Sequence, residues 1–304
     1  MLDHGPIFPS EIFTSIIEHL FEEEASLGRR SDVLASIREK ERLATIDACT
    51  HVCKAFKYIC RPFYFRQVEL GFNENTAGQR RFDHLLQRID TNPEIVRYIR
   101  ALRIDWKGTP PGAPTPQCNN REDLAQRMNF LLNIPNLQSL SLCFSKVSQE
   151  FNLPSALEVK AFCNRLIDSY TSLTVTRSTT IHSFHAQKVA GLPYDKILAC
   201  PTLHTFSLDR CLWPVLKQPV SHLASLKLRK ISSYIPISSL LYMPNLTELS
   251  LDSAYFNDDP ADHNGQPELR TPLRPPYGLK TVTLHTAIGL TDQFHIFASE
   301  AKQF

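Results

Sequence analysis

The sequence predicts an α/β fold, with a small helical module near the N-terminus followed by parallel strands that stack side by side into a curved solenoid. The first observation is a template of three apolar residues that recurs along most of the chain. The second is that the stretches between copies change to a helical period, and the third is that proline often stands just before a copy. Since no single repeat can bury its own core, such units must pack against their neighbours.

The template reads apolar-x-x-apolar-x-apolar, and its last two positions alternate with polar residues, as a strand with one buried face requires. A weaker copy lies at Ile181/Phe184/Ala186. The clear copies are Phe65/Val68/Leu70, Ile99/Leu102/Ile104, Leu137/Leu140/Leu142, Leu203/Phe206/Leu208, Leu223/Leu226/Leu228, Leu246/Leu249/Leu251 and Leu279/Val282/Leu284. Between Ala186 and Leu251 the last positions are 22, 20 and 23 residues apart, and the longer steps elsewhere indicate inserted helices or loops.

The segments between the copies carry helix and loop signals. A stripe at Phe82, Leu85, Leu86 and Ile89 predicts a helix that Asn92-Pro93 stops, followed by a further helical turn up to Tyr98. The stretch from Leu157 to Tyr170 predicts another helix, although its first part could instead hold a degenerate repeat. The proline-rich segment 108–116 and the segment 257–276, with its Asp, Gly and Pro content, are expected to be loops; the second is either a tolerated insertion or a loop that grips a partner.

Two apolar helical stripes lie near the N-terminus. The first follows the capping residue Ser10 and consists of Ile12, Phe13, Ile16, Ile17 and Leu20. The second follows a charged insertion at 22–42 and consists of Leu43, Ile46, Cys49, Val52, Cys53 and Phe56. Together they predict a helical hairpin of about fifty residues, which is too small to bury enough surface alone. Either it caps the following domain, or it packs one face there and offers the other to a partner.

Composition and charge exclude several classes of protein. Hydrophobic residues make up 42% and charged residues 21%, which is typical of a folded globular chain. The net charge of +2 gives no general attraction to nucleic acid. No apolar run approaches the roughly 20 residues of a membrane span, and the first eleven residues do not resemble a signal peptide. We therefore expect a cytoplasmic or nuclear protein that binds neither nucleic acid nor membrane.

No catalytic residue, metal or cofactor is predicted. The 8 cysteines are expected to be reduced thiols that behave as small buried hydrophobes. Cys49, His51 and Cys53 lie close together, but no second cluster provides the paired spacing of a structural zinc site. No glycine-flanked nucleophile or Gly-rich phosphate loop accompanies the serines and histidines, so the chain is not expected to be an enzyme, and a hydrolase is the minor alternative.

The N-terminal stripes resemble an F-box of the kind found in basidiomycete fungi. The family pattern of Leu-Pro-x-Glu, apolar pairs and Leu-Val-Cys-Arg-x-Trp is similar to residues 8–12, 16–20 and 51–56. Residues 61–70 are similar to the strand that often follows it. Phe8, Lys54 and Phe56 replace the family's leucine, arginine and tryptophan, and the charged insertion is longer than usual; if it folded over the docking face, it would block binding.

The resemblance implies binding to a Skp1-like adaptor protein, which bridges to cullin ligase machinery. The residues that it implies for this contact are Phe8, Pro9, Ile12, Ile16, Leu20, Val52, Cys53 and Phe56.

Residues 61–304 resemble irregular leucine-rich repeats. That family often places asparagine or cysteine three positions after the last strand leucine, and only Cys211 clearly fits. The chain is therefore divided into an F-box-like helical module at 1–60 and an irregular leucine-rich-repeat domain at 61–304. The resemblance implies a substrate-recognition adaptor of an SCF-type ubiquitin ligase, with an unknown protein client on the repeat arch. The alternative is a free-standing leucine-rich-repeat interaction scaffold without a ligase.

The polar strand positions are expected on the concave face of the arch, where a client would bind. Small hydroxyl side chains dominate these rows, so the charged side chains among them are the predicted client contacts. They are Arg103, Asp209, Lys227, Arg229, Glu248, Asp252 and His285. If their strands are neighbours, Arg229 lies between Asp209 and Asp252, and this triplet either neutralises itself or recognises a ligand.

Overall fold

A computed structural model describes a large part of the chain. The described residues are 11–16, 18–19, 41, 44–52, 54–73, 76–107, 129–144, 161, 164–170, 181–189, 191–214, 216, 218–257 and 278–285. The chain divides into two compact units, one of Met1–Val68 with Arg88–Arg100 and one of Glu69–Gln87 with Ala101–Phe304. The division of the sequence at residue 60 into two domains stays a prediction.

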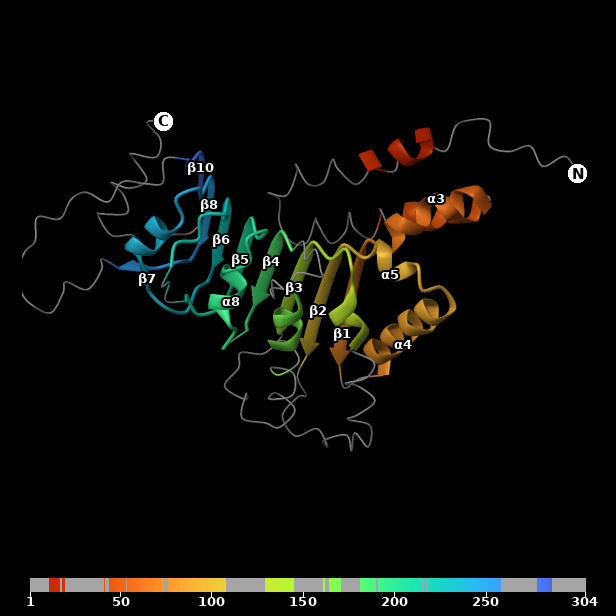
Figure 1. The fold of residues 1–304 in the computed structure, drawn as a ribbon, viewed down its shortest axis with the longest axis horizontal. Helices are drawn as coiled ribbons and strands as arrows, with labels where there is room; N and C mark the ends of the chain where they lie inside the picture. The colour runs from red at the N-terminus through yellow and green to blue at the C-terminus, as the bar shows by residue number, and fades with distance from the viewer. Residues whose placement is uncertain are drawn as a thin grey trace, which may run out of the picture. The chain divides into compact units, whose positions relative to one another are not determined.

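An open sheet organises the second unit (Figure 1). Among the described residues its strands are β1 (Gln67–Asn73), β2 (Ala101–Lys107), β3 (Ser139–Phe144), β4 (Ser183–Gln187), β5 (Thr205–Asp209), β6 (Ser225–Arg229), β8 (Glu248–Asp252) and β10 (Thr281–Leu284). They lie in chain order, and each pairing from β2 to β10 is parallel. The predicted α/β class and the parallel strands are therefore confirmed, including the strand of the weaker template copy.

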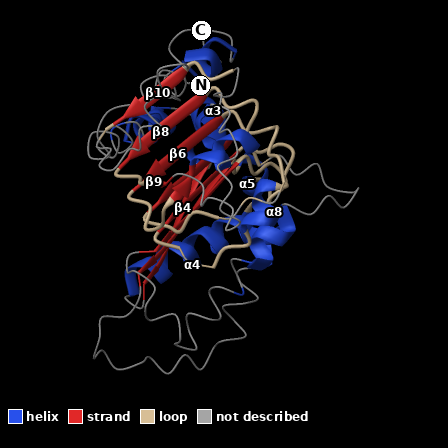
Figure 2. Ribbon diagram, turned by 90° about the vertical axis from the view of Figure 1, so that its left-hand side faces the viewer, coloured by secondary structure: helices blue, strands red, loops and turns tan. Residues whose placement is uncertain are grey.

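The apolar template residues share one face of the sheet. Leu140, Phe184 and Phe206 are register partners on β3, β4 and β5, and all three are buried. Phe184 and Phe206 stack with ring centroids 6.0 Å apart. Helix α8 (Tyr194–Leu198) lies on this side, where the Tyr194 ring meets Phe206 edge-on at 6.3 Å. Figure 2 shows α8 to one side of the strands. The core of the second unit thus lies between these two layers.

Several connecting elements agree with the sequence and others do not. The predicted helix and the turn after it are α4 (Thr76–Thr91) and α5 (Ile95–Tyr98), and residues 164–170 are helical as expected. Two 3-10 helices, η1 (Asn129–Asn133) and η3 (Ile237–Tyr242), were not specified by the pattern. Nor was a small parallel sheet of β7 (Ile235–Pro236) and β9 (Phe256–Asn257), because two residues are too few to show a period. The loop predicted at 108–116 lies outside the described residues, as does the loop at 257–276 beyond Asn257.

A left-handed residue follows the end of each of four strands. Lys188, Arg210, Lys230 and Ser253 have φ of 56°, 55°, 49° and 54°. The N–H groups of the first three donate to the carbonyl oxygens of Asp209, Arg229 and Asp252 on the next strand, at 2.8, 2.8 and 2.6 Å. The residue after each left-handed position is buried, and these residues are Val189, Cys211, Ile231 and Ala254. The position where asparagine or cysteine was sought is thus filled mainly by apolar side chains.

Replacing Lys230 by valine is expected to lower the free energy of unfolding by about 1–2 kcal/mol, because a β-branched residue fits a positive φ poorly. Glycine at the same position is expected to change it by less than about 1 kcal/mol, since no Cβ opposes that φ. Urea denaturation of both variants measures the difference. A valine variant as stable as the glycine variant would contradict the left-handed turn.

Helices make up the core of the first unit. Residues 11–16, 18–19 and 44–52 are helical, and α3 follows at Lys54–Tyr64. Ile46, Cys60 and Phe63 are buried together, with Phe56 and Ile59 packed against them. The strand expected from Arg61 onward is wrong in its first part, because α3 continues through Tyr64 and β1 begins only at Gln67. The helix continues because Phe63, three residues after Cys60, falls on the same buried helix face.

Candidate functional site

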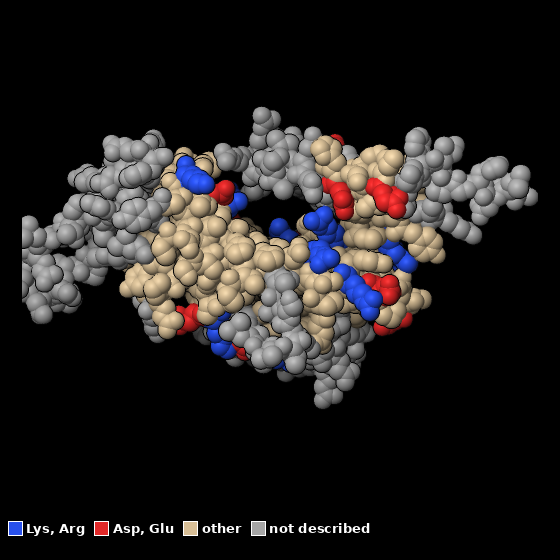
Figure 3. Space-filling model, turned by 45° about the horizontal axis from the view of Figure 1, so that its top comes forward, with Lys and Arg blue, Asp and Glu red and all other residues tan. Residues whose placement is uncertain are grey.

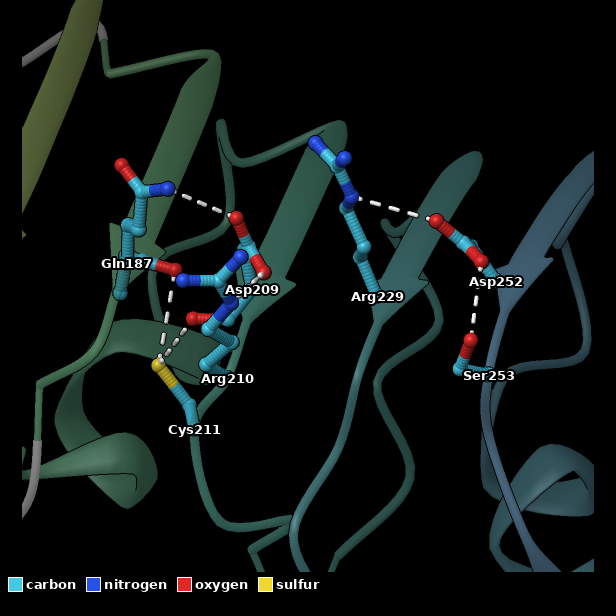
Figure 4. A network of polar contacts seen from close by, with 8 residues as sticks. Gln187, Asp209, Arg210, Cys211, Arg229, Asp252 and Ser253 are labelled. Carbon is cyan, nitrogen blue, oxygen red and sulfur yellow. Dashed lines mark hydrogen bonds and ion pairs between the residues drawn. The ribbon is translucent and has the colours of Figure 1, made fainter. Parts of the chain in front are cut away.

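The open face of the sheet, opposite the buried template residues, brings several predicted residues together. Asp209, Arg229 and Asp252 are register partners on β5, β6 and β8. The predicted placement of Arg229 between the two aspartates is therefore confirmed. Figure 4 shows these residues at the carboxyl ends of their strands, with Gln187 at the corresponding place on β4.

The polar side chains at these strand ends form two separate groups. Gln187 Nε2 donates to Asp209 Oδ2 at 2.7 Å, and Arg210 Nε lies 3.7 Å from Asp209 Oδ1. Arg229 Nε instead donates to Asp252 Oδ2 at 3.1 Å, while Ser253 Oγ donates to Asp252 Oδ1 at the same distance. Asp209 is only 4% exposed. Asp252 therefore has a basic partner on the neighbouring strand and Asp209 has one in the turn that follows β5, which favours self-neutralisation over ligand recognition.

The remaining predicted client residues lie along the same face. Arg103 Nε lies 3.3 Å from Asp105 Oδ1 and 3.9 Å from Glu69 Oε1. Glu248 is exposed and accepts a hydrogen bond from Ser225 Oγ at 3.2 Å. Lys227 and His285 are also exposed. Their contact with a client stays a prediction.

His185 and Ser207 form a side-chain pair on the same face. His185 Nδ1 lies 3.0 Å from Ser207 Oγ, across the pairing of β4 with β5. This pair is the observation that bears on the hydrolase alternative. Nucleophilic catalysis also needs a group that orients the base and donors that stabilise an oxyanion, so a serine–histidine hydrogen bond does not by itself define a catalytic centre.

Three buried cysteines of the described residues are poor nucleophiles. Burial raises the pKa of both the Cys60 and Cys143 thiols to about 11, and burial also raises the pKa of Cys211. These thiols stay protonated at neutral pH and therefore lack the thiolate that attacks substrates or binds metals. Among the described residues no group of three His, Cys, Asp or Glu side chains could hold a metal ion. Cys53, which was weighed with Cys49 and His51, lies outside them.

Large apolar side chains are exposed on the first unit. Ile12, Ile16 and Val52, three of the residues predicted to bind the adaptor, are 46%, 53% and 68% exposed. Phe56, a fourth, is half-buried, and its ring meets the Phe13 ring at 4.5 Å. The other predicted adaptor contacts, Phe8, Pro9, Leu20 and Cys53, lie outside the described residues, as does the insertion at 22–42 except Glu41.

The sequence reasoning missed a second set of exposed apolar residues. Leu212, Tyr234 and Tyr255 are 51%, 69% and 39% exposed, and we call them the edge strip. Each stands directly before a large buried residue, and these partners are Trp213, Ile235 and Phe256. The sequence did contain a signal for this set, because a pair of adjacent large apolar residues follows each of β5, β6 and β8.

The charged surface shows both signs. The face drawn in Figure 3 carries both basic and acidic side chains of the described residues. Within the described part of the chain, no helix has the length and apolar character needed to cross a membrane.

Comparisons with known proteins add no family to this description. A scan against protein-family models found no match, and searches of curated proteins and of solved structures found no similar protein either. The functional argument therefore rests on the residues of this chain.

Proposed function

We propose that the chain is a substrate-recognition adaptor of an SCF-type ubiquitin ligase. Its F-box-like helices would dock a Skp1-like adaptor, and an irregular leucine-rich-repeat arch would hold a protein client. Such a protein would act in the cytoplasm or nucleus and would transfer nothing itself, because its role is to raise the concentration of the client near the ligase machinery. The observation that carries the proposal is the exposure of Ile12, Ile16 and Val52.

The geometry of the first helix supports a division of labour between its faces. Ile12 and Ile16 are four residues apart, which places them on the same helix face. Phe13 packs against Phe56 of α3 instead. Val52, at the end of the helical residues 44–52, is exposed as well. One side of the helices thus builds the core of the unit, while another leaves aliphatic surface in water.

The magnitude of this exposure favours a partner. Burying a large aliphatic side chain contributes roughly 1.5–3 kcal/mol before the costs of association are subtracted. Three such residues supply enough for a specific complex if they are covered together. Single exposed apolar residues are common on protein surfaces, so it is their position in the F-box-like motif that gives this set its meaning.

The sheet supports the client-holding half of the proposal. Strands in chain order, joined by turns of one repeated kind, are typical of repeat proteins in which each unit contacts its neighbours. Such stacks present a broad, continuous face, and here that face carries hydroxyl, amide and charged side chains that could exchange hydrogen bonds with a client.

Changing Ile16 to aspartate is expected to weaken binding to a Skp1-like adaptor by at least thirtyfold, or about 2 kcal/mol, because a charge would be buried at a hydrophobic contact. The measurement is copurification of the full chain with the adaptor, followed by titration. Tyr58→Ser is the matched control, since Tyr58 is 71% exposed in the same unit but lies two residues from Phe56 and so on another side of α3.

The proposal fails if the wild-type chain does not bind the adaptor, or if both variants bind as well as it does. Either result would favour the free-standing scaffold, in which the helices serve only to complete the fold. Circular dichroism of both variants shows whether the helices are intact.

A further inference from the structure

We infer that the edge strip, together with the basic residues shortly before it in the chain, binds an extended peptide segment of a partner protein in which acidic and apolar residues alternate. This names the kind of client segment, so it rests on the client-holding half of the proposed function. It does not depend on docking through the N-terminal helices.

The backbone segments that carry the edge strip are joined by hydrogen bonds. Ser232 N–H donates to the Cys211 carbonyl at 3.1 Å and Trp213 N–H donates to Ser233 Oγ at 2.8 Å, which ties the turn after β5 to the turn after β6. Ile235 N–H donates to the Tyr255 carbonyl at 2.9 Å, which ties β7 to β9. Leu212, Tyr234 and Tyr255 therefore lie on three successive, joined segments.

Rigid aromatic side chains make good binding anchors. The Tyr234 and Tyr255 rings meet edge-on with centroids 6.4 Å apart, so each restricts the other. The buried residues that follow them, Ile235 and Phe256, fix the backbone from behind. Tyrosine loses little rotamer freedom on binding and is enriched among residues that dominate interface energies.

Basic residues stand at the strand ends shortly before the edge strip in the chain, with Arg210 two residues before Leu212 and Lys230 four residues before Tyr234. The left-handed residues Lys188, Arg210 and Lys230 follow the ends of the neighbouring strands β4, β5 and β6. We counted the charges at the last residue of β4, β5, β6 and β8 and at the residue that follows each strand. These eight positions hold four basic side chains and two acidic ones. Both acidic groups, Asp209 and Asp252, already have arginine partners. The excess is positive, which is complementary to an acidic partner.

An extended chain matches the spacing of the two tyrosine rings. Side chains on one side of an extended peptide recur every two residues, or about 6.6 Å, close to the 6.4 Å between the tyrosine rings. A peptide laid along the rings would point alternate side chains to opposite sides. Apolar side chains would then contact the edge strip, and carboxylates would reach the basic residues.

Fluorescence anisotropy of the full chain tests this with defined probes. The first probe is a labelled nine-residue peptide that alternates leucine with glutamate, and the second replaces each glutamate by lysine. The leucine–glutamate probe is expected to bind, with an affinity that falls as the salt concentration rises. The leucine–lysine probe is expected to bind at least tenfold more weakly than the leucine–glutamate probe. The double variant Tyr234→Ser/Tyr255→Ser should weaken binding of the first probe by about thirtyfold. Lys230→Glu should weaken it by about tenfold.

Matched controls lie elsewhere on the chain. Lys280→Glu and Tyr58→Ser change exposed residues of the same kinds and are expected to leave binding of the leucine–glutamate probe unchanged. Ile16→Asp should also leave it unchanged, and the double tyrosine variant should still capture the Skp1-like adaptor. The two proposals can therefore fail separately.

The inference is overturned if the leucine–glutamate probe does not bind, if the lysine probe binds equally well, or if the control variants weaken binding as much as the double variant. A single-stranded thymidine oligonucleotide that binds with the same dependence on Tyr234, Tyr255 and Lys230 would also overturn it, in favour of nucleic acid.

Discussion

Replacing Phe206 by alanine is expected to lower the free energy of unfolding by about 4 kcal/mol, within the range for large aromatic side chains removed from a core. Phe206 is fully buried on β5, where it stacks on Phe184 at 6.0 Å and meets the Tyr194 ring of α8 at 6.3 Å. Because the sheet and α8 cannot both close over the cavity, the lost free energy includes van der Waals contacts as well as the transfer of the side chain out of water. Urea denaturation followed by circular dichroism measures it.

Two comparison variants sharpen the test of Phe206. Phe206→Leu keeps most of the volume and should cost less than half as much, since it leaves a smaller cavity. Lys227→Ala changes an exposed side chain of the adjacent strand and should alter stability by less than about 0.5 kcal/mol. If Phe206→Ala were no more harmful than Lys227→Ala, Phe206 could not lie in the core of this sheet.

Replacing Tyr170 by alanine should cost about 4 kcal/mol as well, for two separable reasons. The Tyr170 hydroxyl accepts a hydrogen bond from the buried Ile134 N–H at 3.0 Å and donates one to the Leu131 carbonyl. It thereby ties the helical residues 164–170 to η1 and to the approach of the chain to β3. The substitution leaves a cavity and also leaves a buried N–H without its acceptor.

Tyr170→Phe isolates the hydrogen bonds, because it keeps the ring. It should cost about 2 kcal/mol, the usual range for a buried polar group that loses its partner. Thermal or urea unfolding of the two variants measures the difference. Equal stability of the wild type and the phenylalanine variant would show that these hydrogen bonds are absent in solution.

The strands could be predicted from the sequence because burial imposes a period of two. Leu102, Leu140, Leu226 and Leu249 stand at template positions, and all of them are buried in the sheet. The copy at Ile181, Phe184 and Ala186 also forms a strand, although its alanine weakens the pattern. At the other extreme Leu284 fits the template but is exposed at the end of β10. The template therefore predicts where the strands lie better than it predicts how deeply their side chains are buried.

Features set by local backbone geometry had no such signal. The left-handed residues after β4, β5 and β6 are lysine and arginine, where glycine or asparagine would have indicated a positive φ. The helical state of Arg61 to Tyr64 was missed because Pro62 weakens a helix pattern, whereas the burial of Cys60 and Phe63 maintains the helix.

The candidate site was predicted only in part. Register places Arg229 between Asp209 and Asp252, as the template required. The partners of Asp209 are Gln187 and Arg210, and the template assigned neither of them to the site. The edge strip was missed because Leu212, Tyr234 and Tyr255 lie between the template copies, where the template assigns no position.

The left-handed turn also bears on how such a protein can change length. The turns after β4, β5 and β6 each donate a backbone N–H to the next strand of the sheet, and each described strand of that sheet pairs only with its immediate neighbours in it. A duplicated or deleted segment of some twenty residues would therefore leave the register of distant strands untouched, provided that it ended in a residue able to adopt a positive φ. Gene-level tandem duplication could lengthen this molecule one strand at a time.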